Sequence, residues 1–256
     1  MLEKMCKLNN KTAIVTGASS GLGVQFARAL VEAGAGVALV ARREEKLKKV
    51  NEMLAQSGGK CEYYTADVTV AEQVEKCVQS IHRDFSRIDI LVNNAGYATL
   101  EPTEEHELDS WQKVVDTNLT GLFLFTKYAG RIMIEQKYGK IINISSMYGA
   151  VGNIYMPASS YHASKGAANT FTRAVAAEWA RHNITVNAIG PGFFPSEMTE
   201  EIIEGHDFMD FVKRQCPMER IGRESELDGA LLLLASDASS YITGQVIYVD
   251  GGWTSV

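Results

Sequence analysis

The chain has 256 residues, enough for one large domain with a substantial core. Its formal net charge is −6, and basic and acidic residues are mixed along it without a lysine- or arginine-rich cluster, which argues against nucleic-acid binding. Apolar runs such as residues 231–234 are far too short to span a bilayer, so we expect no membrane partner.

The cysteines are scattered and form no Cys-x-x-Cys pair, which favours reduced thiols in a cytoplasmic protein over disulfides or a zinc site. The first seven residues lack the long apolar stretch of a signal peptide. No cluster of histidine, cysteine and carboxylate residues suggests a metal, and we predict none. The four cysteines are Cys6, Cys61, Cys77 and Cys216.

Short apolar runs alternate with amphipathic segments along the whole chain. Strands alternating with helices are typical of a parallel sheet covered on both faces, and right-handed crossovers then give a doubly wound Rossmann fold. We therefore predict a single α/β domain over residues 1–256. The predicted strands lie near residues 12–16, 36–41, 60–65, 88–92, 140–145, 185–189 and 245–249. The predicted helices lie near residues 21–33, 44–56, 71–85, 109–119, 122–136, 161–181 and 224–235.

The first predicted strand leads into a glycine-rich turn with the spacing Gly-x-x-x-Gly-x-Gly, and an amphipathic helix follows. This order is the context of a phosphate-binding site, because glycine lets backbone N–H groups approach a pyrophosphate and the helix N-terminus adds partial positive charge. We expect the turn to bind a dinucleotide through Gly17, Ser19, Ser20, Gly21, Leu22 and Gly23.

The end of the second predicted strand indicates which dinucleotide is bound. A carboxylate there would bind an adenosine ribose 2′-hydroxyl, whereas an arginine suits a 2′-phosphate. Here the strand leads into Arg42 and Arg43, and no carboxylate appears before Glu44. We predict NADP(H) rather than NAD(H), with Arg42 as the more important contact. The alternative is that both arginines are solvated charges at a helix start.

Polar residues with catalytic potential follow later strands. Two predicted strands end in Asn93–Asn94 and Ser145–Ser146, and the carboxyl ends of parallel strands face the ligand crevice. Asn118 stands inside a helical pattern, where asparagine is unfavourable, so the alternative to a functional role is a turn or cap. Tyr161 and Lys165 are four residues apart in a predicted helix and share a face. A phenol has a pKa of about 10, and a neighbouring ammonium group favours its phenolate.

One long connection, between Gly192 and Ile221, interrupts the alternation of strands and helices. It is rich in phenylalanine, methionine and isoleucine. Connections of this length are uncommon in compact domains and often act as lids. We predict a substrate lid near residues 193–220, with a surface helix packed on the core or on a neighbouring subunit as the alternative.

Together these motifs resemble the classical short-chain dehydrogenase/reductase family, and the resemblance covers essentially the whole chain. It implies a catalytic tetrad of Asn118, Ser146, Tyr161 and Lys165. Residues 93–96 resemble the sheet-stabilising motif of the family, and residues 250–252 resemble its C-terminal signature. The further cofactor-binding residues that it implies are Asp67 and Val68 at the adenine ring, Asn94, Ala95, Gly96, Tyr161, Lys165, and Pro191 and Gly192 beside the nicotinamide.

The tetrad suggests a role for each member. In reduction we expect Tyr161 to give a proton to the carbonyl oxygen as hydride reaches the carbon. Lys165 would lower the tyrosine pKa, and Ser146 would hold the substrate oxygen. The resemblance implies that Asn118 orients a water in a proton relay to Lys165.

The stretch from Ser146 to Tyr161 departs from the family, because it is about two residues longer than the commonest spacing. We keep Ser146 as the catalytic serine, with Ser145 next to it as the second choice. The extra length is expected to reshape the substrate pocket. Ser159 and Ser160 are predicted to be helix caps.

The sequence therefore predicts an NADP(H)-dependent enzyme that interconverts a small-molecule ketone and a secondary alcohol. Aromatic and methionine residues near 147–156 and 193–211 favour an apolar or steroid-like substrate slightly. A sugar-acid dehydrogenase stays open, as does a 3-oxoacyl-thioester reductase whose Arg131 and Arg173 could meet an acidic carrier. A catalytically silent dinucleotide-binding sensor is the non-enzymatic alternative. The resemblance also implies a homotetramer or homodimer built on two long apolar helices.

Overall fold

The computed structural model describes residues 6–56 and 59–256, so the start of the chain, where we expect no signal peptide, lies partly outside the described residues. Parallel strands form a seven-stranded sheet in the order β3-β2-β1-β4-β5-β6-β7. The strands of this sheet are β1 (Thr12–Thr16), β2 (Gly36–Ala41), β3 (Cys61–Thr65), β4 (Ile90–Asn93), β5 (Gly139–Ile144), β6 (Ile184–Pro191) and β7 (Val246–Val249).

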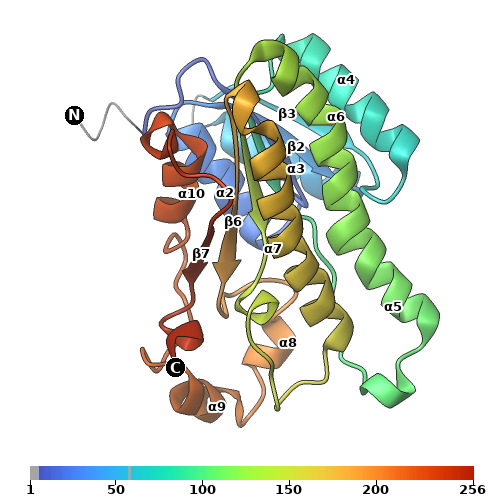
Figure 1. Ribbon diagram of the computed structural model, residues 1–256, viewed down its shortest axis with the longest axis vertical. Helices are drawn as coiled ribbons and strands as arrows, with labels where there is room; N and C mark the ends of the chain where they lie inside the picture. The colour runs from blue at the N-terminus through green and yellow to red at the C-terminus, as the bar shows by residue number, and fades with distance from the viewer. Residues whose placement is uncertain (1–5, 57–58) are drawn as a thin grey trace.

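Helices cover both faces of the sheet (Figure 1). On one face lie α2 (Gly21–Glu32), α3 (Glu44–Ala55) and α10 (Asp228–Ala235). On the other face lie α4 (Ala71–Phe85), α5 (Leu108–Val115), α6 (Gly121–Gln136) and α7 (Ser159–Trp179). Two short helices, α8 (Glu200–Ile203) and α9 (Phe208–Gln215), lie beyond the carboxyl ends of the strands.

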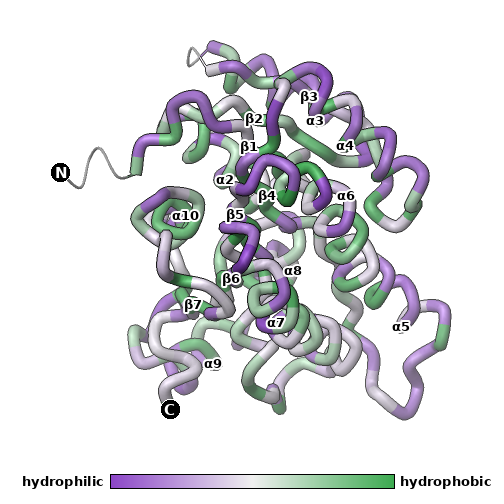
Figure 2. The backbone as a smooth tube through the Cα atoms, turned by 45° about the horizontal axis from the view of Figure 1, so that its top comes forward, coloured by the Kyte–Doolittle hydropathy of each residue, from purple (hydrophilic) through white to green (hydrophobic). Residues whose placement is uncertain are grey.

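The core forms because the central strands are apolar on both sides. Every residue of β1, β4 and β5 is buried, as expected for strands sandwiched between two helical layers. In Figure 2 the backbone around β4, inside the molecule, is coloured as hydrophobic, and hydrophilic stretches lie on the outside. The predicted doubly wound α/β fold is confirmed. No helix within the described ranges is long and apolar enough to cross a membrane.

The predicted helix at residues 109–119 is split in the structure. After α5 the residues Asp116–Thr120 form a π-helix that runs directly into α6. Asn118 therefore occupies a widened helical turn and not the turn or cap that was the alternative to a functional role. Its side chain tolerates this place because it accepts a hydrogen bond from the Tyr97 backbone N–H at 2.7 Å and donates one to the Tyr97 carbonyl at 2.9 Å. Single π turns of this kind often occur at functional sites.

Two predicted helix starts are also wrong. α7 begins at Ser159, and Ala158 takes the N-cap position, so Ser159 and Ser160 are not caps. Ala158 pairs with Glu101 in an isolated β-bridge, which fixes the chain ahead of the serines. α10 begins at residue 228 rather than 224, because Ser225 adopts a left-handed φ of 70° that ends any earlier helical turn.

Candidate active site

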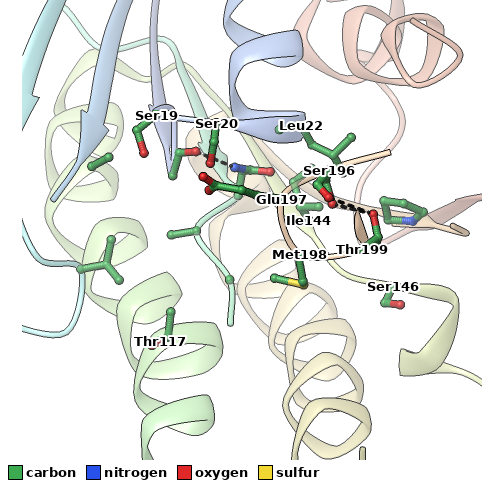
Figure 3. A pocket seen from close by; sticks show the side chains of 18 of the residues that line it. Ser19, Ser20, Leu22, Thr117, Ile144, Ser146, Ser196, Glu197, Met198 and Thr199 are labelled. Atoms are coloured by element: carbon green, nitrogen blue, oxygen red, sulfur yellow. Dashed lines mark hydrogen bonds between the residues drawn. The ribbon is translucent and has the colours of Figure 1, made fainter. Parts of the chain in front are cut away.

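The carboxyl ends of the central strands open onto a cleft of about 370 Å³. β1 and β4 are neighbours in the sheet, but the chain leaves them toward opposite faces, so the cleft lies at the topological switch point. Figure 3 shows side chains from the glycine turn and from the segment at residues 196–199 converging on it. Every predicted cofactor-binding residue except Gly23 lines this cleft, and so does Ser146.

The glycine turn has the close packing that a dinucleotide site requires. Gly17 and Gly21 have φ values of +67° and +53°, which side-chain-bearing residues rarely adopt. A Cβ on Gly23 would lie only 2.2 Å from the Gly17 carbonyl oxygen, so Gly23 supports the turn from behind. Glycine at these positions leaves the backbone open to a ligand at the start of α2. The residues present therefore fit a bound dinucleotide.

Asn93 and Asn94 hold this end of the sheet together. Asn94 Nδ2 donates to the Thr16 carbonyl at 2.9 Å, which ties β4 to the turn. Asn93 Nδ2 donates to Asn143 Oδ1 at 2.9 Å and to Thr126 Oγ1 at 3.0 Å. These buried bonds link β4, β5 and α6, in keeping with the sheet-stabilising role that the family resemblance implies.

The two arginines after β2 occupy different places. Arg43 reaches the turn, where its guanidinium donates to Ser20 Oγ at 2.8 Å and to Ser19 Oγ at 3.2 Å. Arg42 is 69% exposed and lies 3.7 Å from the Asp67 carboxylate. Both line the cleft, but Arg43 is the one engaged with the turn.

Ser146, Tyr161 and Lys165 meet at the other end of the cleft. Lys165 is buried, and its Nζ donates to the Ile144 carbonyl at 2.7 Å and lies 5.5 Å from the centre of the Tyr161 ring. Ser145 Oγ instead donates to the Lys165 carbonyl at 3.2 Å, a structural contact. Ser146 hydrogen-bonds with the Tyr161 side chain, so the structure favours Ser146 over Ser145 as the partner of the tyrosine.

The electrostatics of this group differ from the sequence expectation. Burial raises the pKa of Tyr161 above its ordinary value, and the hydrogen bond with Ser146 acts in the opposite direction. Burial also lowers the pKa of Lys165 to about 8. Burial outweighs the effect of the nearby Lys165 ammonium group, which donates to the Ile144 carbonyl, so the pKa of Tyr161 is not brought below its ordinary value. Tyr161 is thus a protonated phenol at neutral pH, the form that can donate.

Asn118 does not line the cleft. Besides its two bonds to Tyr97, its Nδ2 donates to Ser164 Oγ at 3.0 Å, and Ser164 lies in the same turn of α7 as Lys165. A Cβ on Gly96 would lie 3.7 Å from both Asn118 Oδ1 and Lys165 Nζ. Asn118 therefore lies directly behind the wall of the cleft, beside Lys165.

Aromatic side chains enclose the space next to Tyr161. Tyr148 follows Ser146 in the chain, and its ring packs edge-on against Phe193 and Trp253. Tyr155, in the longer segment between the serine and the tyrosine, stacks on Phe211 of α9 with ring centres 4.4 Å apart. The longer segment between Ser146 and Tyr161 therefore contacts α9, which belongs to the predicted lid. Buried members of this aromatic cluster are Met147, Tyr148, Met156, Phe193, Phe208, Phe211, Val212, Cys216 and Trp253.

Residues 196–199 form one wall of the cleft; they fall within the lid that we predicted, but none of them was named as a site residue. Thr199 shapes it by donating to the Phe194 carbonyl at 2.6 Å. Ser196 lies against the glycine turn, since its Cβ is 3.1 Å from where a Cβ on Gly21 would be. The hydroxyl residues that follow Pro191–Gly192 were the available signal, because this strand also ends at the crevice.

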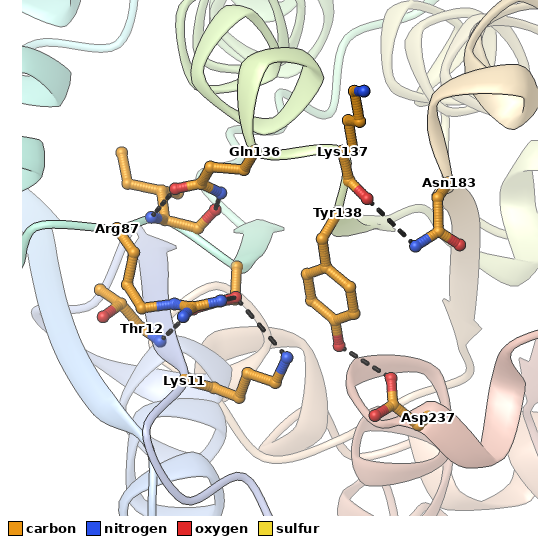
Figure 4. Close-up of polar contacts among 10 residues, drawn as sticks. Lys11, Thr12, Arg87, Gln136, Lys137, Tyr138, Asn183 and Asp237 are labelled. Atoms are coloured by element: carbon orange, nitrogen blue, oxygen red, sulfur yellow. Dashed lines mark hydrogen bonds and ion pairs between the residues drawn. The ribbon is translucent and has the colours of Figure 1, made fainter.

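A second polar cluster lies at the amino ends of β1 and β4, at the end of the sheet away from the cleft. Figure 4 shows Lys11, Thr12 and Arg87 directed at a single carboxylate. That carboxylate is Asp89, which is fully buried and accepts two bonds from Arg87 and one from the Thr12 backbone N–H. These contacts join the starts of β1 and β4, so this cluster has a structural role.

A doubly wound sheet with a glycine turn and a serine, tyrosine and lysine group at its switch point defines a dinucleotide-dependent oxidoreductase. Residues 17–254 match the family model described as enoyl-(acyl carrier protein) reductase. The chain belongs to the short-chain dehydrogenase/reductase family.

Individual relatives differ in the substrates that their names give. The chain is 37% identical to gluconate 5-dehydrogenase of Gluconobacter oxydans, over 96% of each chain. It is 38% identical to a 3-oxoacyl-[acyl-carrier-protein] reductase of Synechocystis, over 97% of this chain and 98% of the relative. Its fold matches a gluconate 5-dehydrogenase of Burkholderia cenocepacia, crystallised with NADP and tartrate, with a TM-score of 0.96, 34% identity and full coverage of both chains.

Proposed function

We propose that the protein is an NADP(H)-dependent oxidoreductase that interconverts a ketone and a secondary alcohol, with Tyr161 as general acid and base. One observation carries the proposal: Tyr161, Ser146 and Lys165 share a single cleft with the glycine turn and Arg43. The relative crystallised with NADP supports the choice of cofactor. Bound NADP(H) would supply or accept the hydride through its nicotinamide ring.

The side chains of this protein transfer the proton and stabilise the charge on the substrate oxygen. Ser146 donates a hydrogen bond to the substrate oxygen and stabilises the negative charge that develops there in reduction. Tyr161 gives its proton to that oxygen. The ammonium group of Lys165 stabilises the phenolate left behind, and Asn118 positions the helix turn that carries Ser164 and Lys165. In alcohol oxidation the same groups act in reverse.

Arg43 should contribute most to the preference for NADPH over NADH, with Arg42 as a weaker second contact. A hydrogen bond to a charged group contributes about 1.5–3 kcal/mol, so Arg43→Asp should raise the KM for NADPH roughly tenfold to a hundredfold. The KM for NADH should change much less. Arg42→Asp is the matched variant and should show the same pattern with a smaller effect. Wild-type preference for NADH, measured as the ratio of kcat/KM values, would contradict the cofactor assignment.

The cleft favours a neutral, largely apolar substrate. Among the described residues, the cations that line it are Lys165 at the catalytic end and Arg42 and Arg43 at the turn. In the part of the chain that the structure describes, no arginine lines the catalytic end of the cleft, and the neighbouring wall is aromatic. Similarity to gluconate 5-dehydrogenases makes a sugar acid the second candidate.

An acyl-carrier substrate has less support from this chain. Arg131 lies 3.9 Å from Glu75 on the outer helices, and Arg173 borders a separate hollow beside β7. Neither lines the cleft, so any contact of these arginines with an acidic carrier would be made on the outer surface, away from Tyr161.

A carbonyl panel followed by NADPH absorbance tests the proposed function. We expect neutral cyclic or aryl ketones to be reduced with a kcat/KM at least about tenfold above that for 5-ketogluconate, the effect of roughly 1.4 kcal/mol. A 3-oxoacyl thioester should be the poorest substrate. Preference for 5-ketogluconate would shift the assignment to the second candidate, and no turnover in the presence of bound NADPH would favour a silent sensor.

The assembly stays a prediction. Phe123 of α6 is 43% exposed and packs edge-on against Phe171 of α7, with ring centres 6.4 Å apart. An apolar face of this kind fits the homodimer or homotetramer that the family resemblance implies. The lid near residues 193–220 likewise stays a proposal.

A further inference from the structure

The carboxylate of Glu197 lies between two cationic side chains beside the glycine turn. Its carboxylate accepts a two-pronged interaction from Arg43, with Nη1–Oε1 at 3.0 Å and Nη2–Oε2 at 2.7 Å. Lys46, one turn into α3, also pairs with it. Ser20 hydrogen-bonds with the same carboxylate. Two cations and a hydroxyl thus surround one anion from a distant part of the chain, as Figure 3 shows for Ser20 and Glu197.

This arrangement has the chemistry of a phosphate site. A guanidinium fork binds a carboxylate and a phosphate in the same two-pronged way. Arg43 also donates to Ser19 and Ser20, so it is held in place by the turn itself. Since the fork of Arg43 already serves Glu197, a 2′-phosphate at the turn would have to displace that carboxylate, which it would also repel.

The carboxylate does not act alone, because its neighbours hold the segment over the cleft. Ser196 packs against Gly21, and Thr199 fixes the turn at residues 196–199 through the Phe194 carbonyl. α8 begins at the next residue. Release of Glu197 from Arg43 therefore removes the ionic contact between this segment and the turn, and leaves the packing of Ser196 against Gly21 to hold the wall of the cleft.

We propose that Glu197 is a latch that stands in for the 2′-phosphate of the cofactor, so that a 2′-phosphorylated nucleotide, and not its unphosphorylated counterpart, releases the segment at residues 196–199. The proposal rests on the proposed function, because it requires a cofactor with a 2′-phosphate. It makes Glu197 a specificity-determining residue that lowers affinity for NADP(H) and couples binding to lid position.

The size of the effect follows from the exposure of the contact. The side chains of Arg43, Lys46 and Glu197 are each nearly half exposed. Their pairing therefore changes the ratio of the paired state to the released state by at most about fivefold. Removing the latch should tighten binding of a 2′-phosphorylated ligand by about that factor.

The test uses the full chain and two fragments of the cofactor, adenosine 2′,5′-bisphosphate and 5′-AMP, with Kd measured by calorimetry. Wild type should bind the bisphosphate more tightly than AMP. Glu197→Gln should strengthen bisphosphate binding about fivefold and leave AMP binding nearly unchanged. Glu204→Gln is the control, because it removes an exposed charge shortly after the segment at residues 196–199, whereas the ion pair of Arg43 is made with Glu197.

The outcomes separate this proposal from the proposed function. Equal wild-type affinity for the bisphosphate and AMP overturns the cofactor assignment and the latch together. Tighter bisphosphate binding in wild type, with no gain in Glu197→Gln or an equal gain for AMP, overturns the latch alone. As a second readout, the bisphosphate should speed hydrogen exchange at residues 194–203 in wild type, whereas AMP should not; unchanged exchange would also overturn it.

Discussion

Tyr161→Phe should retain NADPH binding and reduce ketone turnover by about 10²- to 10⁴-fold, the usual contribution of a positioned general acid. The change removes one hydroxyl and keeps the ring that packs against the aromatic cluster. Tyr161 is suited to the role because burial raises its pKa, so the phenol holds its proton at neutral pH. Its side chain also hydrogen-bonds with Ser146, the residue proposed to hold the substrate oxygen.

Two measurements make the Tyr161→Phe result decisive. The Kd for NADPH should stay within about twofold of wild type, since the turn and Arg43 are untouched. Tyr241→Phe removes a hydroxyl from a fully exposed tyrosine and should keep wild-type kcat. If Tyr161→Phe turns over as fast as Tyr241→Phe, the proton comes from another group.

Lys165→Met should lower kcat/KM for reduction by about 10²- to 10³-fold, the effect of removing one preorganised charge-stabilising donor. The ammonium group of Lys165 lies near the phenol, and the burial that lowers its pKa to about 8 makes its charge sensitive to mild alkali. The cation is present below pH 8 and is lost as the pH rises through that value. Wild-type kcat/KM for NADPH-driven reduction should therefore fall above about pH 8.

The pH profile separates a catalytic Lys165 from a purely structural one. In Lys165→Met the alkaline limb near pH 8 should disappear, leaving a low and flat profile, while the Kd for NADPH reports whether the cleft is intact. An alkaline limb that persists in the variant would assign the titration to a different group. Loss of NADPH binding together with an unchanged limb would reduce Lys165 to a packing role.

Much of the fold was predictable because its signals are local. Apolar runs such as 12–16 and 36–41 match β1 and β2 residue for residue, since buried parallel strands are continuous apolar segments. The glycine turn was equally clear, because positive φ at Gly17 and Gly21 and the crowding at Gly23 leave few substitutes for glycine. The residues of the cleft could also be predicted, because the carboxyl ends of parallel strands all lie at the same end of the sheet.

Other features depended on contacts between distant segments. The π-helix at Asn118 is stabilised by Tyr97, and the start of α7 is fixed by the bridge between Ala158 and Glu101. Neither pairing leaves a periodic pattern in the sequence. Helix propensity alone therefore placed the caps one or two residues away from where tertiary contacts put them.

The chemistry of the cleft shows the same limit. The sequence made Arg42 the more important arginine, but the side chain that reaches the turn is Arg43, engaged by Glu197 from 154 positions along the chain. Sequence reasoning also expected Lys165 to depress the pKa of Tyr161. Burial of Tyr161 sets the direction of the shift, and burial cannot be read from a four-residue spacing.

Deuterium transfer tests the central claim most directly, because it follows the atom that the reaction moves. Wild-type protein is incubated with a neutral ketone and NADPH carrying deuterium at both C4 positions of the ring, and the alcohol is examined by mass spectrometry and NMR. We expect a secondary alcohol with one deuterium on the carbinol carbon, formed at a rate that Tyr161→Phe almost abolishes. An alcohol without deuterium, or tight binding of NADPH with no alcohol formed from any ketone or keto acid, would contradict it.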